Sequence, residues 1–89
     1  MSNLSEFSQQ EHEALEFQRR IGANIRNWRE RRTLATWELA RLCGRPIAAI
    51  ERIESGEEMP SLEFLWQAAR IMRVPCLALT DQHDHRSAA

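Results

Sequence analysis

Arginine supplies all of the positive charge in this sequence, because none of its 12 basic residues is a lysine. The guanidinium group can form paired hydrogen bonds with a phosphate or with guanine, so arginines are the first candidates for recognition chemistry. Arg45 and Arg52 lie in the stretch GRPIAAIERIESG, whose helical periodicity predicts a helix over about 46–55. On that helix, the face opposite the inward-pointing isoleucines carries four residues: Ala48, Glu51, Arg52 and Ser55.

Residue types that perform catalysis or bind metals are few and scattered. His12 lies among acidic residues, His83 and His85 lie near the C-terminus, and nothing supplies a nucleophile with its base or a phosphate-binding loop. Cys43 and Cys76 stand apart with no CxxC pair, and we expect both to be reduced, buried residues of a cytosolic protein. The sequence therefore predicts a cytoplasmic protein with no enzymatic activity, no metal site and no cofactor.

The charge changes sign twice along the chain. Residues 1–18 carry a charge of −4, residues 19–56 a charge of +5 and residues 57–89 a charge of −2. A basic centre between acidic ends is typical of a nucleic-acid footprint, although an ordinary solvated surface explains the same pattern. No apolar run approaches the ~20 residues that span a bilayer, so we expect no transmembrane segment.

A long first helix is predicted up to Arg32, after a disordered start over about residues 1–5. Its apolar positions recur at helical intervals: Ala14, Phe17, Ile21, Ile25 and Trp28. Residues 1–18 form an acidic arm that extends this helix beyond the domain proper. Gly22 indicates either close packing or a break between the arm and the helix. Phe7 continues a seven-residue spacing of apolar positions that could add a helical dimer seam, but so few repeats do not predict a coiled coil.

Two shorter helices follow, and together they form a helix-turn-helix pattern. The first begins near Thr36 and ends at Gly44, a residue suited to a helix C-terminus. Pro46 fits the first turn of the next helix, because its missing N–H has no partner there, and Gly56 closes that helix. Such a unit holds its second helix out from the domain, so that side chains can enter a DNA groove.

The remaining chain predicts two more helices and a tail. Ser61 is a suitable N-cap for a fourth helix, whose core stripe is Leu62, Leu65, Ala68, Ala69 and Met72. Phe64 and Trp66 lie off that stripe. A short fifth helix follows, and residues 81–89 are expected to be a flexible tail. No stretch alternates apolar and polar residues as a strand would, so we predict an all-α fold of five helices, with one domain over residues 19–80.

In this order and at these intervals, the residues resemble the XRE-type helix-turn-helix family, the relatives of the lambda repressor and Cro. The resemblance covers residues 20–79 and rests on the following positions: Ile21-Gly22, Ile25, Arg26, Trp28, Arg29, Glu38-Leu39-Ala40, Gly44, Ile50, Ile53-Glu54, Gly56, Pro60-Ser61 and Leu65. It implies a lambda-repressor-like fold and sequence-specific binding to double-stranded DNA, as a homodimer on a palindromic operator.

The resemblance also implies roles for individual residues. In relatives the third helix lies in the major groove and the second rests across the phosphate backbone, so the expected DNA contacts are Thr36, Trp37, Arg41, Arg45, Ile47, Ala48, Glu51 and Arg52. Arg29 is expected to form a structural ion pair with Glu54 that ties the first helix to the third. For Trp37 a packing role remains an alternative, as does an ordinary solvated position for Arg45 and Arg52.

The outward positions depart from the family pattern. Ala35 and Thr36 stand where relatives commonly have a Ser or Thr cap followed by glutamine, and Thr33 replaces a usual glycine. The apolar side chains that open the recognition helix can contact a thymine methyl group, but they do not distinguish base pairs by hydrogen bonds. Arg52 is the one obvious base-reading side chain, and three acidic residues near it would repel phosphate: Glu51, Glu57 and Glu58.

A second hypothesis therefore stays open, a protein-interaction module on the same fold. It would be antitoxin-like or an accessory subunit, with weak DNA binding or none. Phe64 and Trp66 lie near the region that relatives use for dimer contact and could form an exposed apolar patch. We assign both to a dimer interface, with completion of the core as the alternative.

Overall fold

The computed structural model describes residues 3–82, and side chains from residue 8 onward, as five α-helices without a strand between them. The helices are α1 (Asn3–Arg31), α2 (Thr36–Cys43), α3 (Ile47–Glu54), α4 (Leu62–Met72) and α5 (Leu77–Thr80). The predicted all-α fold of five helices is confirmed. The expected flexible tail lies outside the described residues except for its first two positions, so His83 and His85 are not placed.

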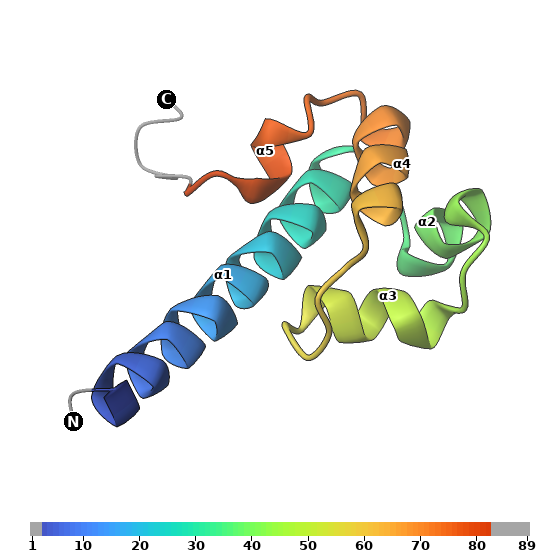
Figure 1. Ribbon diagram of the computed structural model, residues 1–89. Coiled ribbons are helices and arrows are strands. Elements are labelled where there is room, and N and C mark those ends of the chain that lie inside the picture. The colour runs from blue at the N-terminus through green and yellow to red at the C-terminus, as the bar shows by residue number, and fades with distance from the viewer. Residues whose placement is uncertain (1–2, 83–89) are drawn as a thin grey trace.

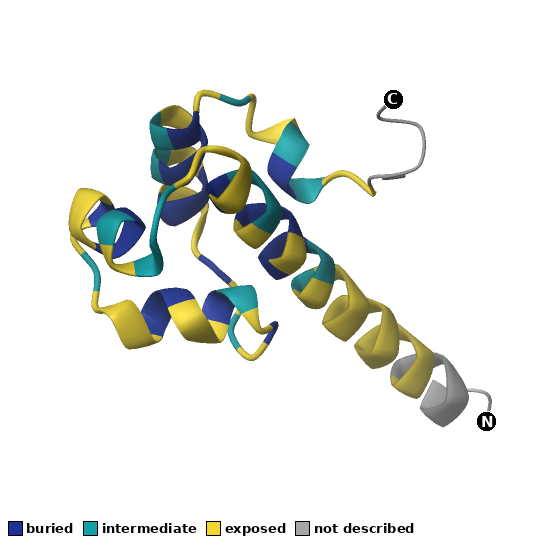
Figure 2. Ribbon diagram, turned by 180° about the vertical axis from the view of Figure 1, so that it is seen from behind, coloured by how far each residue is buried: buried dark blue, intermediate teal, exposed yellow. Residues whose placement is uncertain are grey.

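The two halves of α1 have different surroundings. Helices α3, α4 and α5 pack against its C-terminal half, and α2 lies on α3 and α4 (Figure 1). Every side chain from residue 8 to residue 17 is exposed, so the N-terminal half projects from the body of the domain (Figure 2). The helix already begins at Asn3, earlier than predicted, because no glycine or proline interrupts the chain before Gly22.

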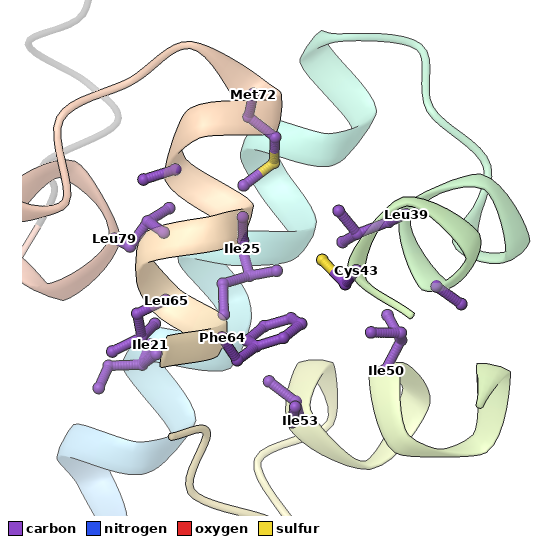
Figure 3. Packing of buried hydrophobic residues seen from close by; sticks show 13 residues of the cluster. Ile21, Ile25, Leu39, Cys43, Ile50, Ile53, Phe64, Leu65, Met72 and Leu79 are labelled. Carbon is purple, nitrogen blue, oxygen red and sulfur yellow. The ribbon is translucent and has the colours of Figure 1, made fainter. Parts of the chain in front are cut away.

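All five helices contribute to one apolar core, and α4 contributes the most residues (Figure 3). The buried set is Ile21, Ile25, Leu39, Ala40, Cys43, Ile50, Ile53, Phe64, Leu65, Ala68, Ala69, Met72 and Leu79. Burial of such side chains contributes roughly 1.5–3 kcal/mol each for the large aliphatic and aromatic residues. The core therefore fixes how α2 and α3 are presented on the surface.

Gly22 allows α1 and α3 to approach closely. A Cβ atom at this position would lie 2.1 Å from the carbonyl oxygen of Ile53 and 3.0 Å from that of Glu54. Helix α1 continues through Gly22 without a break, so close packing explains the glycine. Beside this contact, Gln18 Nε2 donates a hydrogen bond to the carbonyl oxygen of Gly56 at 2.8 Å.

Side chains of α1 and its C-terminal end also hold the ends of α4 and α5. Asn24 is buried, and its Nδ2 donates to the carbonyl oxygens of Leu79 at 3.0 Å and Asp81 at 2.9 Å. Arg32 Nε donates to the carbonyl oxygen of Met72 at 2.7 Å, at the C-terminus of α4. These bonds satisfy carbonyl groups that a helix end leaves without an internal partner.

Three side chains lie differently from the sequence prediction. Phe64 is fully buried rather than exposed, whereas Leu62, assigned to the core stripe, is 83% exposed. The buried face of α4 is formed by Phe64 and Leu65 and by the residues one and two helical turns after them. Leu62 lies at the edge of this face, in the first turn of the helix. Ala49, one of the apolar residues that open the recognition helix and were expected to be available to thymine methyl groups, is buried, because it shares a face with Ile53, four residues later.

Candidate nucleic-acid interface

The turn between α2 and α3 follows from local backbone preferences. Gly44 ends α2 with φ 66°, a left-handed conformation that favours glycine, and the Arg45 N–H donates to the carbonyl oxygen of Ala40 at 2.9 Å. Pro46, with φ −64°, is the N-cap of α3 and so lies just before the helix rather than in its first turn. This short turn, with the core beneath it, holds α3 in a fixed direction relative to α2.

The outer face of α3 brings together the residues that were expected to contact DNA. Ile47 is 46% exposed, and Ala48, Glu51 and Arg52 are also exposed. Their backbone is rigidly supported, because Ile50 and Ile53 on the opposite face are fully buried. The outer face of α3 is therefore a pre-formed surface with two apolar side chains near its start and two charged ones near its end.

Helix α2 provides a neighbouring edge with aromatic and basic character. Trp37 is 54% exposed, and the Arg41 guanidinium lies 5.8 Å from the centroid of a Trp37 ring. Thr36 is half-buried at the first position of the helix. Ala35 provides no side-chain cap, but Glu38 Oε1 accepts a hydrogen bond from the Ala35 N–H at 2.8 Å, which is one half of a capping box.

Both candidate arginines around α3 already have partners within the chain. Arg52 Nε donates to Glu58 Oε1 at 2.9 Å. Arg45 Nη2 donates to Ser61 Oγ at 3.3 Å, and its guanidinium lies 5.4 Å from the centroid of the Phe64 ring. Neither arginine is therefore an ordinary, unattached surface cation, and each is held in a defined place at one end of α3.

The charge of this surface is divided along α3. The side near α2 carries Arg41 and Arg45, with Glu63 Oε1 3.8 Å from Arg45 Nη2, whereas the far end and the following loop carry Arg52 together with Glu51, Glu57 and Glu58. A phosphate backbone that follows the whole face would meet attraction at one end and repulsion at the other. The arrangement therefore favours contact with phosphates at the end of α3 near α2 and does not provide a uniformly basic surface.

The ion pair between α1 and α3 lies beneath this surface. Arg29 Nε donates to Glu54 Oε2 at 2.7 Å and its Nη2 donates to Glu54 Oε1 at 3.0 Å, a bidentate arrangement. The two side chains are only 10% and 8% exposed, and Arg29 Nη1 also donates to the carbonyl oxygen of Leu34 at 2.7 Å. The hydrogen bond to Glu54 raises the pKa of Arg29 above its ordinary value, although burial opposes the shift. The pair fixes the end of α3 to α1.

The aromatic residues of α4 do not form the shared patch that was expected. Trp66 is 53% exposed and the Arg70 guanidinium lies 4.9 Å from the centroid of a Trp66 ring. Phe64 is fully buried, so its assignment as an exposed interface residue is wrong. Trp66 instead borders a shallow groove of about 350 Å³, lined by Leu42, Trp66, Gln67, Arg70 and Ile71.

The two cysteines have different environments. Cys43 is buried in the core, and burial raises the pKa of its thiol, although the positive charge of Arg45 acts in the opposite direction. Cys76 is exposed just before α5, so the expectation that both cysteines are buried is wrong for this residue. Within residues 8–82 no three side chains of metal-binding type come together, and no helix of the described chain is long and apolar enough to cross a membrane.

Sequence reasoning did not identify several residues that organise the site. Glu58 was treated only as a repulsive charge, although its position six residues after Arg52 lets it return to that side chain across the end of α3. The sequence did not indicate that Asn24 is buried, because a polar residue within a helix has the same sequence pattern whether it faces solvent or another element. Leu42 was likewise not recognised as part of the groove beside α4.

Comparisons with known proteins agree with the described geometry. The family profile for the helix-turn-helix domain matches residues 20–82. Among solved structures, the restriction-modification controller protein C.AhdI from Aeromonas hydrophila is 23% identical with a TM-score of 0.65, over 68% of this chain and 92% of that one. An HTH_3 family transcriptional regulator from Vibrio cholerae is 29% identical with a TM-score of 0.67, over 73% of this chain but only 36% of that protein's chain. No curated protein matches the sequence.

Proposed function

Because the chain belongs to the helix-turn-helix domain family, of the XRE type, we propose that it is a small transcriptional regulator that binds a palindromic operator as a dimer. In this proposal α3 enters the major groove and α2 lies across the phosphate backbone. The observation that carries the proposal is the outer face of α3, where Ile47, Ala48 and Arg52 face solvent from a helix whose other face is anchored in the core.

The exposed side chains divide into base contacts and backbone contacts. Arg52 is suited to guanine, Ile47 and Ala48 to thymine methyl groups, and Glu51 to the amino group of cytosine. The α2 edge and the turn supply the phosphate contacts: Thr36, Trp37, Arg41 and Arg45. Phosphate contacts set the register of the protein, and the few base contacts then select the sequence.

Only a few base contacts are available, so DNA shape contributes to specificity in this proposal. The acidic end of α3 lowers attraction to DNA in general, which makes sequence-independent binding weak. Sequences that bend or narrow toward the basic α2 edge would then be favoured without direct base contacts.

Titration of the protein onto the DNA upstream of its own gene tests the proposal. At several salt concentrations, the logarithm of affinity should fall linearly with the logarithm of salt, because bound phosphates release counterions. A site-preferring complex at low salt is the expected result. Its absence from both upstream DNA and a random-sequence pool would contradict the proposed function.

A protein-interaction role is a second candidate, favoured by the groove beside Trp66. The groove combines Leu42, Trp66 and Ile71 with Arg70, and exposed aromatic residues of this kind often anchor interfaces. If a dimer forms through this surface, Trp66→Ala should lower the association constant in sedimentation experiments, while Leu77→Ala, which removes another exposed apolar side chain, should not. An unchanged sedimentation profile for Trp66→Ala would count against this surface.

A further inference from the structure

The loop after α3 closes back on a single residue, Arg52. The carbonyl oxygen of Arg52 accepts hydrogen bonds from the N–H groups of Glu57 at 2.9 Å and Glu58 at 3.2 Å. At the other end of the same residue, Arg52 Nε donates to Glu58 Oε1 at 2.9 Å. Glu58 therefore holds both the backbone and the side chain of Arg52.

We propose that Glu58 is a positioning residue that fixes the Arg52 guanidinium for base recognition, an inference that rests on the proposed function. The bond to Glu58 uses Nε and leaves the two terminal nitrogens, which make no hydrogen bond within residues 8–82. Those two nitrogens can form the paired bonds with O6 and N7 of guanine. DNA can therefore be engaged without breaking the Arg52–Glu58 contact.

Pre-ordering of Arg52 would favour specific binding. An arginine side chain has several rotatable bonds, and ordering it only when DNA binds lowers the affinity. Here Glu58 orders the side chain in the free protein, and Glu58 is itself held by its backbone bond to Arg52. The entropic cost of ordering is then met on folding rather than on binding.

The Glu58 carboxylate also changes the balance between specific and non-specific binding. Non-specific affinity depends mainly on positive charge near phosphates, and the Arg52–Glu58 pair has no net charge. The directed hydrogen bonds of Arg52 to a base remain available. An acidic residue at a DNA-facing surface thus raises the ratio of specific to non-specific affinity instead of only opposing binding.

Glu57 is a matched control within the same loop. It carries the same charge one position earlier and is also near the end of α3. Its Oε2 accepts a hydrogen bond from Ser55 Oγ at 2.6 Å, so its side chain is occupied away from the Arg52 guanidinium. Replacing either glutamate by glutamine removes one negative charge, but only one of the two changes weakens the support of Arg52.

The experiment compares Glu58→Gln and Glu57→Gln in the full-length protein. Affinity is measured for a selected site, for each single-base variant of that site, and for unrelated DNA at the same salt concentration. Both variants should bind unrelated DNA a few-fold more tightly. Only Glu58→Gln should lower discrimination at one base pair, by about fivefold or more, and it should have no such effect in an Arg52→Ala background.

Each alternative result has a separate meaning. If the native protein selects a sequence but Glu58→Gln and Glu57→Gln discriminate equally well between the selected site and its single-base variants, the positioning role is overturned and the proposed function is not. A native protein that prefers no sequence would overturn both. In the free protein, NMR relaxation of the Arg52 Nε–H group should show restricted motion compared with that of the exposed Arg73, and equal mobility of the two would overturn the positioning role even if Glu58→Gln did not fold.

Discussion

Helix α3 has an inner face of Ala49, Ile50 and Ile53 and an outer face of Ile47, Ala48, Glu51 and Arg52. On the inner face Ile50 and Ile53 agree with the XRE-type pattern, whereas the outer face departs from it with apolar and acidic residues. Positions on the inner face are constrained by close packing, because a volume change of even one methylene group in a core alters stability. Outer positions have no such constraint, so they can change with the DNA sequence or the partner. Changes on the two faces should therefore have separable effects on stability and on binding.

The largest expected loss of stability comes from the ion pair beneath α3. Arg29→Ala would leave the nearly buried Glu54 carboxylate without its bidentate partner, which should lower the free energy of unfolding by about 3–5 kcal/mol. The raised pKa of Arg29 means that its contribution is complete below the ordinary arginine pKa and is lost only when the pH rises above the raised value. Because Arg29 stays charged, the loss of unfolding free energy caused by Arg29→Ala should be the same at every pH near neutrality.

The free energy of unfolding of Arg29→Ala is measured by chemical unfolding, and Arg26→Ala is the control. Arg26 is also on α1 and also pairs with a glutamate, Glu30, but both side chains are mostly exposed. Its removal should change stability by no more than about 1 kcal/mol. Similar losses for the two variants would contradict the structural role of the Arg29–Glu54 pair.

A smaller loss is expected from the contact between α1 and α3 at Gly22. In an isolated helix, Gly22→Ala would stabilise by about 1 kcal/mol. Here the new Cβ would lie 2.1 Å from the Ile53 carbonyl oxygen, so the helices must move apart and the variant should lose about 1–3 kcal/mol. Thermal unfolding measures the sign of the change directly. A more stable Gly22→Ala protein would show that the close approach is absent in solution.

The smallest expected effect is a gain of stability at the link between α1 and α2. Thr33 adopts φ 55°, a left-handed conformation that is strained for a β-branched residue. Thr33→Gly should raise the free energy of unfolding by up to about 1 kcal/mol, because relief of strain exceeds the added freedom of the unfolded chain. Arg73→Gly, at φ 58° after α4, should change stability in the same direction. A loss of stability in both variants would contradict the strain.

The fold could be predicted largely because helical periodicity and helix-end residues act locally. Most of the inward set from Ile21 to Met72, apart from Phe64, was visible in the sequence, as was the Ser61 cap, whose Oγ accepts a hydrogen bond from the Phe64 N–H at 3.0 Å. The errors arose at element ends. Leu62 is three residues before Leu65, but at 100° per residue it lies at the edge of the buried face of α4, so its side chain is exposed.

The candidate site was less predictable, because its geometry depends on contacts between elements. The exposed face of α3 follows from helical angles, but the bond from Arg52 to Glu58 depends on the path of a loop. The groove beside Trp66 requires α2 and α4 to lie side by side, which no local pattern reveals. Residue types at the surface indicated what chemistry is available, while only the fold shows which groups act together.

Arg52→Ala, measured both by unfolding and by DNA binding, tests most directly whether the outer face of α3 selects a DNA sequence. The free energy of unfolding should change by no more than about 0.5 kcal/mol, while base preference at one position of the site should fall by about 1–3 kcal/mol. An equal loss of affinity for all DNA sequences would make Arg52 a backbone contact. No loss of preference at any position would contradict the claim that the outer face of α3 selects a DNA sequence.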